Sequence, residues 1–292
     1  ILGSTGMLGY GVLSSLIKYN NIKISATVRN KKTLQLIKKK KPYNKIRKYY
    51  FLDTKKINQL KLNKIVSEYD YIINCIGVIK PEIKVNNAKS LKNAIFTNSI
   101  FPKMLAISIK DKKKKLFQIA TDCVFSGKKG KYTENSYHDD LEIYGISKSL
   151  GEIKSKNFFN IRTSIVGKEV IKKKSLLEWV INNKDLTLNG FVNHDWNGIT
   201  TKAFGEALYS IINYNLVIPN SIHLIPKDKV NKYELLKLLK RKFKLNVKID
   251  KYKAKQKIDR TLSTINLKIV NKIWDFSKFR TKPSIKDMIR LI

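Results

Sequence analysis

The chain has 292 residues, a hydrophobic fraction of 42% and a formal net charge of +38. This composition excludes a disordered polycation, and it is sufficient for a sizeable core. No apolar run approaches the roughly 18 residues that a membrane helix needs, and two cysteines cannot form a disulfide framework. We therefore expect a cytoplasmic protein built from one large α/β domain or two coupled lobes.

The positive charge is spread evenly and consists mostly of lysine. The chain has 53 Lys and 7 Arg, and the net charge is +20 over residues 1–150 and +18 over residues 151–292. Proteins that read nucleic-acid sequences favour arginine, whose planar group suits guanine and phosphate. The distribution therefore indicates lysine-rich solvated surfaces, and we expect neither nucleic acid nor a membrane as a partner.

Strands and helices alternate along the first part of the chain. The sequence opens at Ile1-Leu2, a strand stub from which we expect a few residues to be missing, and no signal peptide is visible. The expected strands are Ile22–Val28, Tyr49–Leu52, Tyr71–Cys75, Leu116–Ala120 and Phe158–Arg162. The expected helices are Tyr10–Tyr19, Lys31–Lys41, Ile57–Tyr69, Ala94–Ile109, Tyr144–Lys156, Ser175–Asn183, Lys202–Tyr214 and Lys232–Phe243. This order predicts an α/β fold with a Rossmann-type, doubly wound parallel sheet.

Three glycines stand between the strand stub and the first helix, in Gly3-Ser4-Thr5-Gly6-Met7-Leu8-Gly9. Glycine permits a tight turn and a close approach of the backbone to a pyrophosphate, and a helix N-terminus offers free N–H groups. A structural turn with incidental glycines is the alternative. The context favours a dinucleotide site that includes Gly3, Thr5, Gly6, Met7, Leu8 and Gly9. We predict an NAD(P)-binding domain over residues 1–165 and, over residues 166–292, a smaller substrate-binding lobe partly interleaved with it.

The end of the second predicted strand indicates which dinucleotide binds. An NAD site places Asp or Glu there, whereas an NADP site places Arg nearby for the 2′-phosphate. Here the segment is Val28-Arg29-Asn30, and Arg29 is one of only seven arginines. The sequence therefore favours NADPH, with NADH as the alternative. Asp53, after the third strand, would contact the adenine or cap the next helix.

Tyr144 and Lys148 are four residues apart, and on a helix they share one face. A phenol with an ordinary pKa near 10 needs a cation close by to act as an acid near neutral pH. Thr121 follows the strand Leu116–Ala120, at the carboxyl edge where parallel sheets bind ligands. Its hydroxyl could hydrogen-bond a substrate carbonyl, or it could cap the strand end.

Together these residues resemble the extended short-chain dehydrogenases/reductases, specifically the dTDP-4-dehydrorhamnose reductase-like group. The resemblance covers nearly the whole chain and is strongest up to Gly167. The matching segments are Gly3–Gly9, Asn74–Gly77, Asn98, Ala120–Gly127, Gly130–Glu134, Tyr144–Lys148, Gly151-Glu152 and Arg162–Gly167.

The resemblance implies a catalytic triad of Thr121, Tyr144 and Lys148. Tyr144 would protonate the 4-keto oxygen of a nucleotide sugar, Thr121 would polarise the carbonyl, and Lys148 would bind the nicotinamide ribose and lower the pKa of Tyr144. Asn98 would hold a proton-relay water or a helix distortion. The remaining cofactor residues would be Cys75, Ile76 and Gly77.

The expected substrate residues are Asp122, Cys123, Val124, Phe125, Thr200 and Arg260. The family usually has Tyr at the position of Cys123, which leaves the sugar open, and a small buried hydrophobe is the alternative for this cysteine. Arg260 would grip the diphosphate, because arginine binds phosphate bidentately; a surface charge is the alternative.

The resemblance leaves more than one activity open. Related 4,6-dehydratases carry an Asp-Glu pair after the threonine, whereas this chain has Asp122-Cys123, so we expect a 4-keto reductase acting in the biosynthesis of nucleotide sugars and cell-surface polysaccharides. An epimerase or dehydratase, or a non-catalytic NADP-binding regulatory subunit, is the alternative. The three histidines show no metal-ligand spacing, so no metal is expected. The assembly is left open, with a homodimer as one option.

Overall fold

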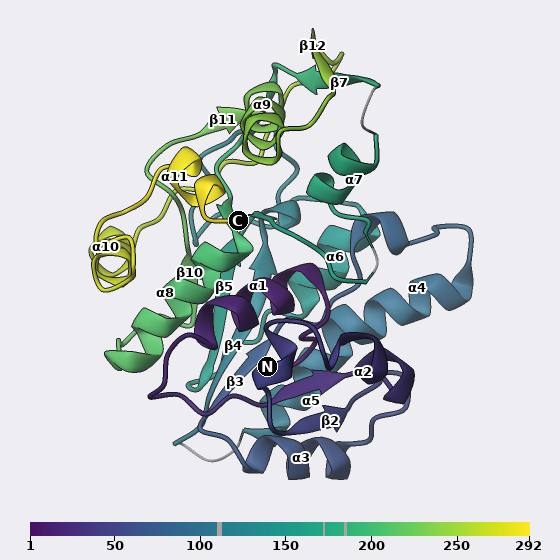
Figure 1. Cartoon of the computed structure of the whole chain (residues 1–292), viewed down its shortest axis with the longest axis vertical. Helices are drawn as coiled ribbons and strands as arrows, with labels where there is room; N and C mark the ends of the chain where they lie inside the picture. Colours follow the sequence, from purple (N-terminus) through teal and green to yellow (C-terminus); the bar gives the residue numbers. More distant parts are fainter. Residues whose placement is uncertain (110–112, 172, 184–185) are drawn as a thin grey trace.

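The core of the protein is a parallel sheet that runs through the middle of the molecule (Figure 1). The computed structural model describes residues 1–109, 113–171, 173–183 and 186–292. One sheet has the strand order β10-β5-β4-β3, and β1 pairs with β2. The Ile1–Leu2 segment joins the two, because Thr27 N donates to Ile1 O at 3.0 Å and Leu2 N donates to Ile73 O at 2.8 Å. The result is a continuous Rossmann-type parallel order, which confirms the predicted fold class.

The strands are β1 (Ala26–Val28), β2 (Tyr49–Phe51), β3 (Tyr71–Asn74), β4 (Lys115–Thr121), β5 (Phe158–Thr163), β6 (Ile165–Val166), β7 (Thr187–Phe191), β8 (His194–Trp196), β9 (Ile199–Thr200), β10 (Ser221–His223), β11 (Val230–Asn231), β12 (Lys248–Tyr252) and β13 (Ile258–Asp259). The helices are α1 (Met7–Leu16), α2 (Lys31–Ile37), α3 (Gln59–Ser67), α4 (Ala88–Ile95), α5 (Phe101–Ser108), α6 (Ile143–Leu150), α7 (Leu176–Asn182), α8 (Thr201–Asn213), α9 (Lys232–Phe243), α10 (Leu267–Asp275) and α11 (Ile285–Arg290).

Helices cover both faces of the central sheet. Successive residues of a strand point to opposite faces, and Leu116 and Phe117 accordingly belong to different core clusters. The cluster around Phe117 includes residues of α1 and α8, and the cluster around Leu116 includes residues of α3 and α5. This double coverage explains why the short strands are almost continuously apolar.

The C-terminal part of the chain is shared between the sheet and a smaller lobe. Strand β10 pairs with β5 in the central sheet, and α8 packs along α1 (Figure 1). The lobe has small sheets of its own, including one with the order β11-β8-β13. The predicted boundary at residue 165 between the NAD(P)-binding domain and the substrate-binding lobe stays a prediction. Beyond this residue, β10 returns to the central sheet.

Several elements differ from the sequence prediction. The helices predicted over Lys31–Lys41 and Tyr144–Lys156 end earlier, at Ile37 and Leu150. The predicted strand Ile22–Val28 is paired only over Ala26–Val28 among the described residues, and Ile22–Ser25 instead line a cavity. The predicted helix Ala94–Ile109 begins earlier, at Ala88, and is interrupted by a π-helical turn over Phe96–Ile100. Such a turn inserts one extra residue per turn, which hydrophobic periodicity does not reveal.

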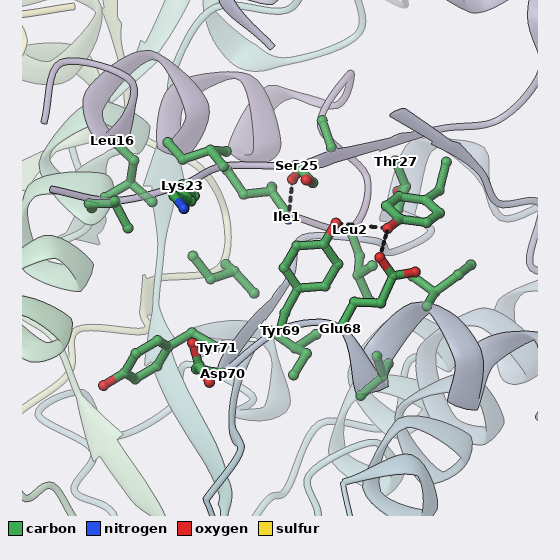
Figure 2. Close-up of a pocket in the computed structure, with 18 of the residues that line it drawn as sticks. Ile1, Leu2, Leu16, Lys23, Ser25, Thr27, Glu68, Tyr69, Asp70 and Tyr71 are labelled. Carbon is green, nitrogen blue, oxygen red and sulfur yellow. Dashed lines mark hydrogen bonds between the residues drawn. The ribbon is translucent and has the colours of Figure 1, made fainter. Parts of the chain in front are cut away.

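The cavity of about 510 Å³ lies beside Ile1 (Figure 2). Its lining includes Ser25 and Ala26 at the start of β1 and Asp70 and Tyr71 at the start of β3. It therefore lies at the amino ends of the strands, whereas ligands of parallel sheets bind at the carboxyl ends. No helix in the described part of the chain is long and apolar enough to cross a membrane.

Candidate functional site

The glycine loop forms a tight turn before α1. Gly3 has a φ of +74°, and a Cβ added to Gly9 would lie 2.1 Å from the Gly3 carbonyl oxygen, so both positions require glycine. Gly3 N donates to Thr27 Oγ1 at 2.9 Å, which fixes the loop to β1. The N-cap of α1 is Gly6, which has no side chain to cap the helix. The first-turn N–H groups thus remain available to an anion, and the loop fits a pyrophosphate.

The other predicted cofactor residues lie around this loop. A Cβ on Gly3 would meet Ile76 Cγ1 at 2.7 Å, so the Cys75–Gly77 segment after β3 borders the glycine loop. Arg29 directly follows β1 and is exposed, with no ion pair among the described residues. Asp53 accepts a hydrogen bond from Lys55 N at 3.1 Å, which closes the turn after β2, while Asn58 is the N-cap of α3.

Asn98 lies in the π-helical turn between α4 and α5 and is 1% exposed. Its Oδ1 accepts from Val78 N at 2.9 Å, and its Nδ2 donates to Val78 O and to Ser147 Oγ, both at 3.0 Å. Both amide hydrogens are therefore used within the protein. Of the two roles that the resemblance implied, the structure contains the helix distortion, and it ties the loop after β3 to α6.

The three predicted catalytic residues lie on two neighbouring elements. Thr121 is the last residue of β4, and Tyr144 and Lys148 lie on α6. Helix α6 packs directly on the turn after β4, because a Cβ on Gly145 would lie 2.4 Å from Cys123 O. The Thr121 hydroxyl lies close enough to the Tyr144 phenol to oppose the rise of its pKa. Gly145, which has no side chain, therefore allows α6 to pack closely against the turn after β4.

The pKa values of Tyr144 and Lys148 are both shifted by burial. Burial raises the pKa of Tyr144; Cys123 and Asp122 raise it further, and Thr121 opposes them. The Lys148 Nζ donates to Ile119 O at 2.6 Å. Burial lowers the pKa of Lys148 to about 8. Burial therefore outweighs any lowering of the Tyr144 pKa, and the effect of Lys148 on this phenol stays a prediction.

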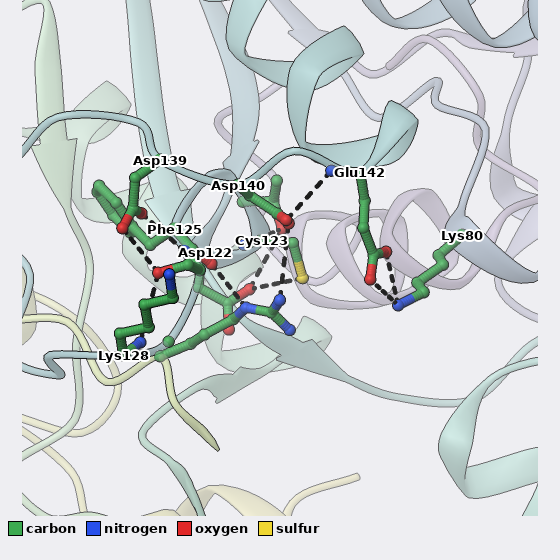
Figure 3. Close-up of polar contacts among 12 residues, drawn as sticks. Lys80, Asp122, Cys123, Phe125, Lys128, Asp139, Asp140 and Glu142 are labelled. Atoms are coloured by element: carbon green, nitrogen blue, oxygen red, sulfur yellow. Dashed lines mark hydrogen bonds and ion pairs between the residues drawn. The ribbon is translucent and has the colours of Figure 1, made fainter. Parts of the chain in front are cut away.

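The segment after Thr121 is a 3-10 turn, Asp122–Val124 (Figure 3). Asp122 is 7% exposed, and it accepts from Thr121 Oγ1 at 3.2 Å and from Cys123 Sγ at 3.6 Å. Burial raises the pKa of the Cys123 thiol to about 12. Val124 and Phe125 are fully buried, so their side chains form core rather than a ligand surface.

The two predicted substrate residues of the lobe have different surroundings. Arg260 Nε donates to Phe125 O at 2.7 Å, and its guanidinium lies 3.6 Å from the Asp140 carboxylate. The structure therefore places Arg260 against the turn after β4. Thr200 is 1% exposed, and its hydroxyl accepts from Ala203 N at 3.2 Å as the N-cap of α8. This capping role, rather than a substrate contact, accounts for its side chain.

Lys232, the first residue of α9, is a site residue that the sequence analysis missed. Its Nζ lies 5.4 Å from the centre of the Trp196 ring. Burial lowers the pKa of its ammonium, whereas Asp122 and Cys123 raise it and Arg260 lowers it. Within the described ranges no atom accepts a hydrogen bond from this ammonium. One lysine among 53 carries no signal in the sequence, since only folding brings α9 to the turn after β4.

A further ion pair joins the two sides of the site. Lys80, in the loop after β3, pairs with Glu142 at 2.6 Å, just before α6 (Figure 3). Both side chains are largely exposed. Among the described residues, no group of three or more His, Cys, Asp or Glu side chains is placed to hold a metal ion.

The fold and the site define an extended short-chain dehydrogenase/reductase with a Rossmann-type nucleotide-binding sheet. The sequence model described as RmlD substrate binding domain matches residues 1–264, so the chain belongs to that family. Comparison with curated protein sequences finds no match.

Solved structures support the same fold. A hypothetical dTDP-4-dehydrorhamnose reductase from Sulfolobus tokodaii is 22% identical, with a TM-score of 0.72 and coverage of 95% of each chain. The dTDP-4-dehydrorhamnose reductase of Bacillus anthracis, solved in complex with NADP, is 19% identical, with a TM-score of 0.71 and coverage of 99% of this chain and 95% of that one. UDP-glucuronic acid 4-epimerase from Bacillus cereus is 15% identical, with a TM-score of 0.73 and the same coverage.

Proposed function

We propose that this protein reduces the 4-keto group of a nucleotide-activated 4-dehydro-6-deoxy sugar with NADPH. The observation that carries the proposal is the convergence of Thr121, Tyr144 and Lys148 at the carboxyl end of β4, on a sheet whose glycine loop fits a pyrophosphate. The family match and the similarity to reductases, one of them solved with NADP, support it.

Each catalytic residue has a role that follows from its surroundings. When bound, NADPH supplies the hydride that this reaction adds to the carbonyl carbon. The Thr121 hydroxyl, which donates to Asp122 Oδ1 in this structure, would donate its hydrogen to the sugar carbonyl instead. Tyr144 would donate the proton that converts the carbonyl oxygen into a hydroxyl. The raised pKa of Tyr144 keeps its proton in place for donation. Lys148 projects from α6 to the backbone of β4, where its ammonium would hold the nicotinamide ribose.

The substrate's diphosphate is assigned to Arg260 together with Lys232. Both cations lie close to Asp122 and Cys123, on the side of the turn that faces the lobe. The Lys232 ammonium rests over Trp196 and has no acceptor among the described residues. A phosphate oxygen would supply that acceptor.

A direct assay tests the proposed function. The protein is mixed with NADPH and a panel of dTDP- and UDP-linked 4-keto-6-deoxy sugars, and the loss of NADPH absorbance is followed. Turnover of one of these sugars is the expected result. NADPH binding without turnover of any sugar would indicate the regulatory-subunit alternative, and conversion without net NADPH loss would indicate an epimerase.

Arg29→Ala is expected to weaken the binding of NADPH but not of NADH. Hydrogen bonds to a charged group contribute about 1.5–3 kcal/mol, which corresponds to roughly ten- to hundredfold in Kd. Fluorescence titration with both cofactors measures the effect, and Arg47→Ala, another exposed arginine, is the matched control. Equal weakening of both cofactors would remove the 2′-phosphate role of Arg29.

Lys232→Met is expected to raise the KM for the nucleotide sugar about tenfold and to leave kcat within about threefold, because methionine keeps the apolar stem and removes the charge. Lys237→Met is the matched control, since Lys237 lies on the same helix with its Nζ 5.3 Å from the Tyr233 ring centre. Steady-state kinetics with varied sugar measure both constants. An unchanged KM for Lys232→Met would exclude a substrate contact.

A further inference from the structure

A buried arginine lies behind the active-site turn. Arg162 on β5 is 1% exposed, and its guanidinium carbon lies 5.3 Å from the centre of the Phe125 ring. Phe125 directly follows the Asp122–Val124 turn. Its ring stacks on Tyr132 with a centroid distance of 4.3 Å and meets His138 and His223 edge-on, with centroid distances of 5.5 and 6.2 Å. Arg162 therefore supports the residue that ends the turn carrying Asp122 and Cys123.

The guanidinium is held by one carboxylate and two histidines. Glu152, just after α6, accepts from Nε at 3.2 Å and also pairs with Nη2. His223 Nε2 lies 2.5 Å from Nη1, and His138 Nε2 lies 2.8 Å from Nη2. Since a guanidinium only donates, both Nε2 atoms must be acceptors, and both imidazoles must be neutral.

The second ring nitrogens agree with this assignment. His223 Nδ1 lies 2.7 Å from Ser263 O, which can only accept, so Nδ1 carries the hydrogen. His138 Nδ1 lies 2.6 Å from Ser149 Oγ on α6. Each histidine thus links Arg162 to another element: the C-terminal segment through Ser263, and the catalytic helix through Ser149.

The imidazole rings of His138 and His223 differ in burial and in the charged groups that face them. His223 is fully buried, and Arg162 faces it together with Glu134, whose Oε1 accepts from the His223 backbone N at 2.9 Å and from Thr264 Oγ1 at 2.5 Å. His138 is exposed at the rim, where Glu152 and Asp139 oppose Arg162. Burial and Arg162 lower the pKa of His223 to about 4, and burial, with Arg162 contributing, lowers that of His138.

We propose that His138 and His223 are positioning residues, which as neutral acceptors hold Arg162 beneath Phe125 and so fix the Thr121–Phe125 turn beside Tyr144. Protonation of either ring replaces an acceptor with a donor and places a second cation against the guanidinium, with Glu152 as the one carboxylate paired to Arg162 among the described residues. The effect on turnover rests on the proposed function; the protonation behaviour does not.

The test uses glutamine variants, because a glutamine amide accepts a hydrogen bond at about the reach of Nε2 and does not titrate. At pH 8, His138→Gln and His223→Gln are expected to keep kcat/KM within about threefold of the wild type, whereas His223→Leu loses tenfold or more. In the folded protein His223 takes up a proton only near pH 4, its pKa being lowered to about 4. As the pH falls from about 5 to 4 and below, the wild type is therefore expected to lose kcat/KM by up to tenfold per pH unit for each histidine that becomes protonated, and the corresponding glutamine variant loses less. His194→Gln, on β8, is the matched control with a wild-type profile.

A second readout does not depend on turnover. Since the folded-state pKa of His223 lies below its unfolded value, its contribution to stability is complete above pH 6.5 and declines as the pH falls toward 4, by up to tenfold in the folding constant per unit. Urea midpoints should therefore fall less steeply with acid in His223→Gln than in the wild type. Identical pH slopes in the two proteins, or glutamine variants as inactive as His223→Leu at pH 8, would overturn the proposal. An inactive wild type with the expected urea slopes would instead refute the proposed function alone.

Discussion

Tyr144→Phe is expected to lower kcat by about 10²–10⁴-fold, which is the usual contribution of a positioned general acid. The change removes one oxygen and leaves the ring, so α6 should keep its position on the turn after β4, where Gly145 contacts Cys123 O. The phenol is the group beside Thr121 that holds a proton up to high pH, since burial raises its pKa. Stopped assays of NADPH consumption measure the loss.

The control for this variant is cofactor binding. The glycine loop and Arg29 lie outside the Tyr144 environment, so the Kd for NADPH should remain within about twofold of the wild type. Tyr209 lies on α8 and stacks on Tyr19, just after α1. Tyr209→Phe therefore provides a matched substitution away from the site. A Tyr144→Phe protein with more than a third of wild-type kcat would show that another group supplies the proton.

Arg162→Met is expected to destabilise the protein by about 3–5 kcal/mol, because removal of one partner leaves a buried carboxylate unpaired. Glu152 is 11% exposed in its side chain and would lose its counter-charge, and both histidines would lose the donor that their Nε2 atoms accept. Arg162→Lys should also destabilise, since one ammonium cannot reproduce the planar fork. Urea unfolding at pH 7.5 measures the change.

The double variant Arg162→Met/Glu152→Gln separates the ion pair from the packing. Removal of both charges should recover part of the lost stability relative to Arg162→Met alone, as expected for two residues in direct contact. The surface variant Arg47→Met is the control and should change the free energy of unfolding by less than about 0.5 kcal/mol. A loss below about 1 kcal/mol for Arg162→Met would show that Arg162 does not hold this part of the structure together.

Local signals predicted much of this protein. The glycine loop, the strand that ends at Thr121 and the spacing of Tyr144 and Lys148 are contained in short segments, and their physical meaning depends on neighbours within about ten residues. The alternation of strands and helices predicted the Rossmann-type sheet, which the structure confirms. The helix predicted over Lys232–Phe243 has the observed bounds of α9, because its apolar residues recur with helical period. In the structure Asn231 and Glu234 form a capping box at its start.

Other features could not be predicted, because they depend on contacts between distant segments. The π-helical turn at Asn98 is stabilised by Val78 and Ser147, and Thr200 proved to be a helix cap. The hydrogen bond of the Lys148 ammonium to Ile119 O of β4 also depends on tertiary packing, and the lowering of the Tyr144 pKa by Lys148 stays a prediction.

The sequence by itself determined the fold class and the family resemblance and supplied the candidate catalytic residues, since each depends on local spacing and on the polarity pattern of single elements. The tertiary structure alone decided which charges are buried and what they contact. Arg29 and Arg260 stood out in the sequence as scarce arginines, yet Arg162 is the buried one, surrounded by residues 10 to 61 positions away. Burial and pairing set the energy of a charge, and both arise only when distant segments pack together.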